Sequence, residues 1–530
     1  MSTVREATFD VLRHFGLTTM FANPGSTEVA FLTNLPDDFA FILALHEGSV
    51  VGAATGYALG RDQCALAILH TTAGLGNAVG AIATARVNRA PLVIIVGQQD
   101  RRHLALEPFL AGQLRGLAGE YPVWVNEPVR AQDVPGAIAR AYHEALAQRG
   151  PALVIVPMDD WLADAAPGPF GAPMRVIPGD GGSTTGAAEL GVMLNEARSP
   201  AIVVGAGADD AATWREIGVL AERIGAPVFQ ESFGGRAGFA QDHPSFAGFL
   251  PADRPRLREL LQPYDVVLAI GAPVFRQYPF AEGPLVEDGT RLAVLTREPA
   301  EAHRSPVELA VLGEPAAVLA QLNDAVTPRG ATATTTLVPS APARDGVLRA
   351  AHVMYELGVR LPPDAVVIEE SPSSRPELHA LIPARSNLGF LSAAMGGLGF
   401  ALPAAIGVKL ALADRPVVAV VGDGSSLYNI QALWTAAQYH VGALFIVLAN
   451  GRYAIMDRLA ERIPDGKAPW PGVESIDVAG LATALSCPSQ VVHDFAELDA
   501  ALDELLPTLR ERRAPMLLQV NVVPDLTFNP

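Results

Sequence analysis

The residues best suited to chemistry follow two predicted strands in the C-terminal third of the chain. Asp423 lies in a Gly-Asp-Gly turn directly after the apolar run 417–421, and Asn450 follows the next run, 444–448. Because parallel strands end at the same edge of a sheet, the two side chains are expected close together. Carboxylate and amide oxygens suit Mg²⁺ or Ca²⁺, and a helix N-terminus favours a diphosphate. A Rossmann dinucleotide site is not indicated, because no G-x-G-x-x-G opens this helix.

Three further polar residues lie at predicted turns, helix starts or strand ends near the N-terminus. Ser26 ends an Asn-Pro-Gly-Ser turn, Glu47 opens a helix of small residues, and His70 follows the strand 65–69. Each also has a purely structural interpretation: a turn serine, a carboxylate favoured by the helix dipole, and a polar loop residue. From the residues themselves, a structural role and a role in a functional site both stay open for each of the three.

The composition predicts a large globular protein. Half of its 530 residues are hydrophobic and 18% are charged, which indicates roughly two to four domains. The formal net charge of −18 argues against a nucleic-acid partner. Cys64 and Cys487 form no disulfide framework, and neither a signal sequence nor a membrane span is indicated. We therefore expect a soluble cytoplasmic protein without a membrane partner.

Two segments rich in Pro, Gly, Ala or Thr, 164–186 and 326–345, separate parts with alternating strand and helix patterns. They predict three α/β domains with doubly wound parallel sheets, spanning residues 1–170, 185–326 and 345–530.

The first and third parts share one order of elements: a helix of small residues, a strand, a glycine turn, a helix and a strand. The glycine turns are placed at 74–76 and 422–424, and the second leads into a helix from Ser425 to about Gln438. This order suggests a duplication, with a cofactor cleft between the two domains. The middle part contains Gly205-Ala-Gly207. A tight turn is favoured there and no cofactor is expected, because the third glycine and the downstream acid of a dinucleotide loop are not in place.

Gly-Asp-Gly, followed after one βαβ step by Asn-Gly, resembles the cofactor motif of thiamine-diphosphate-dependent enzymes. With the matching stretches, nearly the whole chain resembles the decarboxylase branch of that superfamily, and most closely the benzoylformate decarboxylases. These stretches are Asn23–Ser26, His46-Glu47, His70, Gly271–Arg276 and Gly396–Gly407. The resemblance implies pyrimidine-binding, middle and diphosphate-binding domains. It also implies bound thiamine diphosphate with Mg²⁺ (or Ca²⁺), a 2-oxo acid or aldehyde substrate, and a homodimer or homotetramer with active sites between subunits.

The resemblance assigns roles to individual residues. Glu47 would hydrogen-bond the pyrimidine N1′ of the cofactor, His70 would transfer protons, and Ser26 would contact the substrate carboxylate. The implied metal ligands are Asp423, Asn450 and the backbone carbonyl of Arg452. The other implied cofactor contacts are Asn23, Pro24, Gly25, Ser373, Gly396, Leu398, Gly422, Gly424, Ser425, Tyr428 and Ile455. The implied pocket walls are Phe109, Leu110, Tyr278, Ile455, Met456 and Leu459.

The chain departs from the family pattern at three positions. Ala449 precedes Asn450 where the family has a second asparagine, Tyr278 occupies the place of a second active-site histidine, and Ile455 narrows the pocket. A phenol titrates at about pH 10 and cannot replace an imidazole in proton transfer near neutrality. The implied reaction is non-oxidative decarboxylation of a 2-oxo acid to an aldehyde. Carboligation or lysis of aldehydes and hydroxyketones is the alternative. A non-catalytic binding protein is disfavoured, because Glu47, Asp423 and Asn450 are all present.

Overall fold

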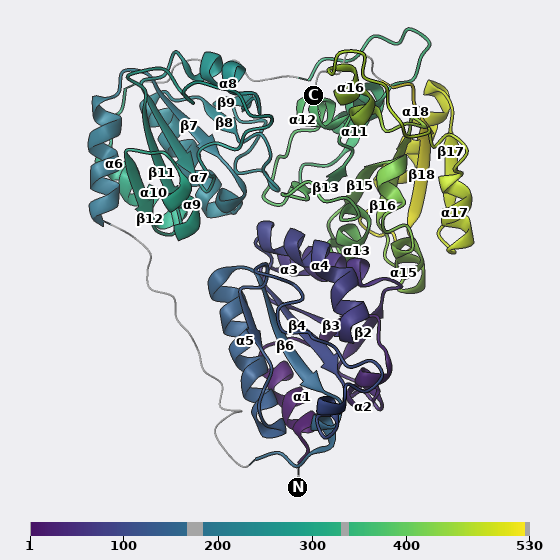
Figure 1. Cartoon of the computed structure of the whole chain (residues 1–530). Coiled ribbons are helices and arrows are strands. Elements are labelled where there is room, and N and C mark those ends of the chain that lie inside the picture. The colour runs from purple at the N-terminus through teal and green to yellow at the C-terminus, as the bar shows by residue number, and fades with distance from the viewer. Residues whose placement is uncertain (1, 167–183, 330–338, 525–530) are drawn as a thin grey trace.

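The structure, a computed structural model, describes residues 2–166, 184–329 and 339–524, which form three α/β units (Figure 1). Each unit contains one six-stranded sheet in which the paired strands are parallel, and each of the three predicted ranges contains one of these sheets. The prediction of three doubly wound α/β domains is confirmed. The central parts of the predicted linkers, 167–183 and 330–338, lie outside the described residues, and the exact domain boundaries stay predictions.

The N-terminal unit has the strand order β2-β1-β3-β4-β6-β5. Strand β4 begins with a run of Leu, Val and Ile and is buried along its whole length, as expected for a strand covered on both faces. The strands are β1 (Thr19–Ala22), β2 (Ala40–Leu43), β3 (Ala65–His70), β4 (Leu92–Gln98), β5 (Trp124–Asn126) and β6 (Pro151–Pro157). The helices are α1 (Val4–His14), α2 (Val29–Leu32), α3 (Glu47–Arg61), α4 (Thr71–Val87) and α5 (Val134–Gln148).

The C-terminal unit has the order β14-β13-β15-β16-β18-β17, which is the same 2-1-3-4-6-5 arrangement as in the N-terminal unit. This shared order agrees with the predicted duplication. The strands are β13 (Val366–Glu370), β14 (Phe390–Ser392), β15 (Val417–Gly422), β16 (Leu444–Ala449), β17 (Ser489–Val492) and β18 (Met516–Asn521). The helices are α11 (Ala350–Arg360), α12 (Arg375–Leu381), α13 (Ala401–Ala411), α14 (Asp423–Ser426), α15 (Ala432–Gln438), α16 (Ala454–Glu461), α17 (Val478–Ala484) and α18 (Phe495–Leu505).

The middle unit has the order β12-β11-β10-β7-β8-β9, the 3-2-1-4-5-6 arrangement of dinucleotide-binding sheets. Its strands are β7 (Pro200–Val204), β8 (Val228–Gln230), β9 (Phe246–Phe249), β10 (Val266–Ile270), β11 (Arg291–Thr296) and β12 (Leu309–Leu312). Its helices are α6 (Thr184–Glu196), α7 (Ala211–Ile224), α8 (Arg254–Leu261), α9 (Pro299–Arg304) and α10 (Pro315–Ala325).

An acid lies beside the turn at Gly205 in the middle unit. Glu231 follows β8 directly, and its side chain is buried. A Cβ added at Gly205 would lie 2.5 Å from Glu231 Oε1. The protein's own carboxylate therefore fills the turn where a phosphate would approach.

Two predicted local features are wrong. The glycine turn at 74–76 does not exist, because α4 begins at Thr71 and both glycines lie inside it. The helix predicted from Ser425 to Gln438 is divided into α14 and α15, and α14 already begins at Asp423. At both positions the chain therefore passes from strand to helix without the intervening turn that the glycine spacing predicts.

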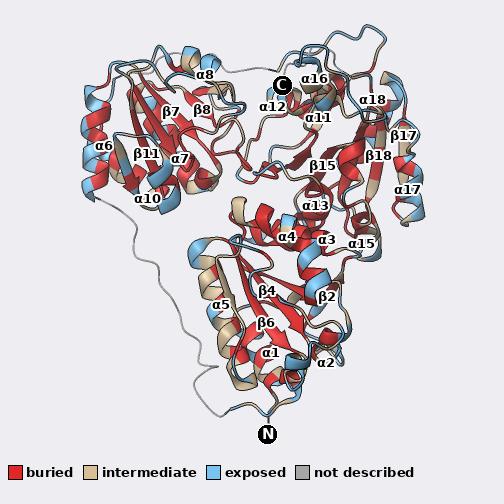
Figure 2. Ribbon diagram, viewed as in Figure 1, coloured by how far each residue is buried: buried red, intermediate tan, exposed pale blue. Residues whose placement is uncertain are grey.

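Helices α3 and α13 pack closely against each other and join the N- and C-terminal units. Both are buried along most of their length (Figure 2). Glycines make the close approach possible: a Cβ at Gly407 would lie 2.6 Å from the backbone nitrogen of Tyr57, and one at Gly52 would lie 2.7 Å from Pro403 Cγ. One hydrophobic core continues from one unit into the other across this contact. None of the helices in the described ranges is long and apolar enough to cross a membrane.

Candidate active site

Glu47 is the first residue of α3 and is held by two amide groups. Asn23 Nδ2 donates to Oε1 at 3.0 Å, and Asn77 Nδ2 donates to Oε2 at 3.0 Å. His46 caps the helix by accepting the N–H of Gly48, and the Glu47 side chain is buried. Since each carboxylate oxygen has one donor from a different element, the carboxylate has a fixed orientation and still has acceptor capacity.

His70, at the end of β3, forms a cluster with two residues of the 3₁₀ turn η1 (Ser26–Glu28). Its Nδ1 lies 3.0 Å from Glu28 Oε2 and 2.9 Å from Thr27 Oγ1. The Thr27 hydroxyl donates to Glu28 Oε1, and the N–H of Gly25 donates to Oε2 at 2.8 Å. His70 and Glu47 are neighbours, because a Cβ at Gly74 would lie 3.5 Å from both side chains.

Asp423 and Asn450 end the adjacent strands β15 and β16, as predicted. Asp423 Oδ1 accepts the N–H of Gly424 at 2.7 Å, and Oδ2 accepts that of Gly451 at 2.6 Å. Burial raises the pKa of the Asp423 carboxyl, and these N–H groups oppose the shift. Asn450 Oδ1 accepts the N–H of Arg452 at 2.9 Å, and this hydrogen bond stabilises the turn that follows β16.

The donor chemistry of this edge fits Mg²⁺ that is shared with a diphosphate. It combines one carboxylate, one amide oxygen and backbone carbonyls, the oxygen ligands that Mg²⁺ takes together with phosphates. Within the described ranges, no group of three or more His, Cys, Asp or Glu side chains could hold a metal ion. A Mg²⁺ ion held by these groups would take its remaining oxygen ligands from phosphate or water.

The segment Gly396–Leu398 precedes α13, and its conformation depends on glycine and on a buried acid. Gly396 has a φ of +74° and Gly399 a φ of +92°, values that strain other residues. Glu370 accepts three successive backbone N–H groups, those of Gly399, Phe400 and Ala401, at 2.6–2.7 Å. Burial raises the pKa of Glu370 to about 7. Its carboxylate therefore fixes the start of α13.

Both other units hold the chain just before this segment. The amide of Asn88, at the end of α4, donates to the Ser392 carbonyl and accepts the Ala394 N–H, both at 2.8 Å. Arg276 of the middle unit donates to the Ala394 carbonyl at 2.9 Å. Asn429 joins the carbonyl of Gly399 to the hydroxyl of Ser49 on α3. The residues on either side of the segment are thus bonded to all three units.

The remaining predicted residues do not form one enclosed site. Ser26 is exposed at the start of η1, and Phe109, Tyr278, Met456 and Tyr428 are exposed, Phe109 by 87%. Leu110, Ile455, Leu459 and Ser373 are partly buried. A cavity of about 480 Å³ lies directly before the segment Gly396–Leu398. It is lined by Val87, Pro273–Arg276, Arg304, Ala394 and Met395. It contains none of the predicted pocket walls.

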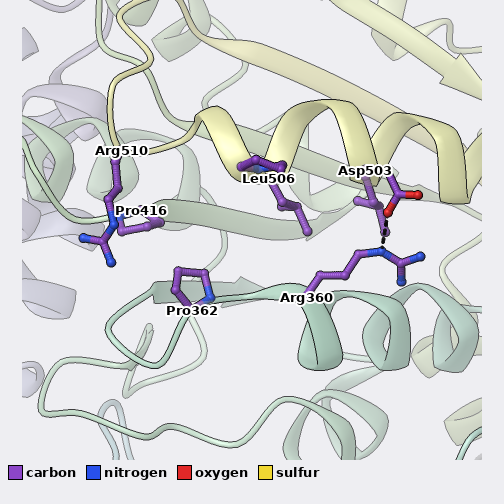
Figure 3. Close-up of a pocket in the computed structure, with 8 residues that line it drawn as sticks. Arg360, Pro362, Pro416, Asp503, Leu506 and Arg510 are labelled. Carbon is purple, nitrogen blue, oxygen red and sulfur yellow. Dashed lines mark hydrogen bonds and ion pairs between the residues drawn. The ribbon is translucent and has the colours of Figure 1, made fainter.

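Another cavity, of about 490 Å³, lies between α11, α18 and the amino end of β15 (Figure 3). Pro416, in its wall, directly precedes β15, whereas Asp423 follows the carboxyl end of the same strand. Its two cationic side chains are paired, Arg360 with Asp503 at 2.8 Å and Arg510 with Asp364 at 2.6 Å. This cavity therefore has no free charge for an anionic ligand and no connection with the predicted site.

The three units match the three domain profiles of one enzyme class. Residues 2–116 match the N-terminal TPP binding domain of thiamine pyrophosphate enzymes, 187–322 the central domain, and 376–520 the C-terminal TPP binding domain. The chain belongs to the thiamine-diphosphate-dependent enzymes, and the prediction of this cofactor is confirmed.

Within this class, the chain is similar over its whole length to a benzoylformate decarboxylase. It is 37% identical to the benzoylformate decarboxylase of Pseudomonas aeruginosa, with 100% of both chains covered. It is 25% identical to an acetolactate synthase of Arthrospira platensis, with 98% of this chain and 94% of that protein covered. The predicted resemblance to the decarboxylase branch is confirmed.

Solved structures give the same assignment. A thiamine diphosphate-dependent 4-hydroxybenzoylformate decarboxylase from Rhodococcus jostii superposes with a TM-score of 0.93 at 35% identity, covering 99% of this chain and 100% of that one. A benzoylformate decarboxylase from Polynucleobacter necessarius superposes with a TM-score of 0.95 at 32% identity and the same coverage.

The sequence did not identify the residues that hold the predicted ones in place. They are Glu28, Asn77, Asn88, Glu370 and Asn429. Glu28 could have been found, because an acid two residues after Ser26 faces the same strand edge as His70. The other four had no local signal, since each binds a segment that is distant in the chain.

Proposed function

We propose that this protein is a carboxy-lyase that converts an aryl or medium alkyl 2-oxo acid, benzoylformate or a close analogue, into an aldehyde and CO₂. The observation that carries the proposal is the buried Glu47 carboxylate, bonded by Asn23 and Asn77, in a chain that aligns end to end with a benzoylformate decarboxylase. When bound, thiamine diphosphate supplies the electron sink that lets the carboxylate leave as CO₂.

The two halves of the site would hold different parts of the cofactor. Asp423, Asn450 and the Arg452 carbonyl would bind Mg²⁺, and Gly422, Gly424, Ser425, Tyr428 and Ser373 would bind the diphosphate. Gly396, Leu398 and Ile455 would contact the rings, and Asn23, Pro24 and Gly25 would contact the pyrimidine. The support is the conformation of these segments, above all the turn at Gly396 and the fixed Asp423 carboxylate.

The chain's own groups handle the protons and the substrate. Glu47 holds a proton at the pyrimidine ring, for which its fixed orientation is suited. His70 moves protons at the reacting carbon, and Ser26 binds the substrate carboxylate. Phe109, Leu110, Tyr278, Met456 and Leu459 exclude water from the bound substrate. The proximity of Glu47 and His70 across Gly74 supports a common task.

We propose that the active site forms between two copies of the chain, in a homodimer or homotetramer. Among the described residues, no hydrogen bond or ion pair connects the Glu47 cluster with the Asp423 cluster. Large apolar side chains are exposed on both units, Leu106 by 81% and Phe109 by 87% on the first, and Ile463 by 64% on the third. A second copy would cover them and supply the missing half of each site.

The activity is tested by CO₂ release from a panel of aryl and alkyl 2-oxo acids, with Glu47→Gln as the inactive reference. The alternative is a carboligase or lyase, which is favoured by the similarity to an acetolactate synthase and by Tyr278 in place of a histidine. If no 2-oxo acid loses CO₂ while aldehydes are joined or hydroxyketones cleaved, the alternative holds.

The assembly is tested by mixing two inactive variants, Glu47→Gln and Asp423→Asn, under subunit exchange. If each site takes Glu47 from one chain and Asp423 from another, mixed dimers contain one intact site, and about a quarter of wild-type activity returns. If both groups come from the same chain, no activity returns.

A cytoplasmic location stays a proposal. Its support is that Cys64 and Cys487 are both buried and free of disulfide bonds.

A further inference from the structure

We infer that Glu28 is a positioning residue for His70, which holds the imidazole by Nδ1 and directs Nε2 toward the substrate. The inference rests on the proposed function, in which His70 moves protons. Glu28 is almost fully buried, with 2% of its surface exposed, whereas 16% of the His70 side chain is exposed at the strand edge. The carboxylate therefore lies behind the imidazole, on the side away from solvent.

The hydrogen bonds determine which ring nitrogen carries the proton of the neutral imidazole. The Thr27 hydroxyl gives its proton to Glu28 Oε1, so toward His70 it can only accept. Glu28 Oε2 is a carboxylate oxygen and can only accept as well. Both groups face Nδ1, which must therefore be the N–H donor. Among the described residues, none hydrogen-bonds Nε2, which is left as the basic nitrogen.

The surroundings fix this arrangement by shape. A Cβ at Gly25 would lie 2.5 Å from Cδ2 of the imidazole, so the backbone of η1 lies directly on the ring. On the other side of the pair, a Cβ at Gly97 would lie 2.9 Å from the Glu28 carboxyl carbon. Neither the ring nor the carboxylate has space to turn. The pair corresponds in its logic to the carboxylate and histidine of a hydrolase triad, where the acid sets the tautomer and orientation of the base.

Two ionisable groups of the described chain lie near His70. Glu28 bonds the imidazole from η1, and Glu47 Cγ lies close to His70 Cβ, since a Cβ at Gly74 would be 3.5 Å from both atoms. Glu47 is bonded by Asn23 and Asn77 and makes no hydrogen bond to the ring. Glu28 is thus the only one of the two acids that can set the tautomer of His70, and the roles of the two acids can be separated by experiment.

The first test measures the tautomer in the wild-type holoenzyme. Protein labelled with ¹⁵N-histidine is observed by two-bond ¹H–¹⁵N correlation, and the His70 signal is assigned by its loss in His70→Ala. We expect a single neutral form with the proton on Nδ1. A neutral form protonated on Nε2 would overturn the inference. Because this readout needs no substrate, it holds even if the protein decarboxylates no 2-oxo acid.

The second test uses Glu28→Gln, whose amide can donate as well as accept, so the tautomer is no longer imposed. We expect a mixture of tautomers and a fall in kcat of roughly 10- to 100-fold, the usual effect of losing an outer partner, with KM nearly unchanged. The pH profile of kcat should also change. Glu6→Gln, which removes a carboxylate from the capping box of α1 in the same unit, is the matched control and should change none of these.

A double-variant cycle separates positioning from a general structural effect. If Glu28 acts through His70, Glu28→Gln should change kcat by less than about threefold in a His70→Ala background. An equal loss in both backgrounds would contradict the inference. If Glu28→Gln does not fold, the wild-type tautomer measurement still decides.

Discussion

Substitution of Gly407 by alanine should separate helices α3 and α13 and thereby disturb both halves of the site. The added Cβ would lie 2.6 Å from the Tyr57 nitrogen and 2.8 Å from the Ala53 carbonyl carbon, and still closer to the Ala53 oxygen. Ordinary contact begins at 3.4 Å, so the helices must move apart by about 0.8 Å or more. Because the obstructing atoms belong to the backbone, no neighbouring side chain can relieve the clash.

The expected cost follows from two opposing effects. Overpacking of this kind costs about 1–3 kcal/mol, and the upper end applies because both partners are helices. Alanine returns up to about 1 kcal/mol through its higher helix propensity. The net loss of about 2 kcal/mol should lower Tm by roughly 4–8 °C. Because Glu47 begins α3 and Gly396–Leu398 lead into α13, a shift of this size should also reduce kcat by about 100-fold.

Differential scanning calorimetry and steady-state kinetics at fixed cofactor concentration measure both effects. Gly218→Ala on α7 is the matched control, since that glycine is also helical and buried. Its Cβ would lie 3.5 Å from His243 Nε2 and 3.9 Å from Phe239, which is ordinary contact, so a small gain in stability is expected. If Gly407→Ala melts within about 1 °C of the wild type and retains full turnover, the close contact of α3 and α13 does not exist in solution.

Three further substitutions test separate parts of the site. Asp423→Asn replaces a proposed direct metal ligand. Loss of a residue that only supports a ligand costs roughly 10- to 100-fold in affinity, so this variant should weaken Mg²⁺-dependent cofactor binding by more than that, as measured by titration calorimetry. Glu370→Gln should remove a pH dependence of stability. Because the pKa of Glu370 is raised to about 7, the wild type loses up to about 3 kcal/mol relative to the variant as pH rises from about 4.5 to 7, which melting curves at several pH values would show. Asn88→Ala leaves the Ser392 carbonyl and the Ala394 N–H unpaired and should cost about 2–4 kcal/mol in urea unfolding.

The sequence predicts the strands and the strand-end residues well, because their signals are local. Strands β15 and β16 are short apolar runs followed by polar residues, and Asp423 and Asn450 follow directly. Parallel pairing then determines that these residues share one edge. The same reasoning places His70 at the end of β3, where the structure has it.

The incorrect predictions arise where tertiary packing overrides local propensity. Gly74 was interpreted as part of a turn, yet it lies inside α4, where its missing side chain leaves space for Glu47 and His70. Glu370 and Asn429 could not be found at all. Glu370 binds backbone groups 29 or more residues away. Asn429 bonds its neighbour Gln431, but its bonds to the Gly399 carbonyl and the Ser49 hydroxyl span 30 and 380 residues. No periodicity or spacing in the sequence indicates such contacts.

The shared strand order explains why the site has two different halves. The second strand of each sheet, β2 or β14, leads to one of the paired helices, α3 or α13. At that position one unit has Glu47 and the other has the Gly396–Leu398 segment. Of the third strands, β3 ends at His70, and β15 is followed directly by Asp423. In the proposed function, equivalent positions of the two units therefore carry proton chemistry in one unit and cofactor binding in the other. Because the equivalent helices pack on each other, each half is held in place by the other unit, and neither can shift independently.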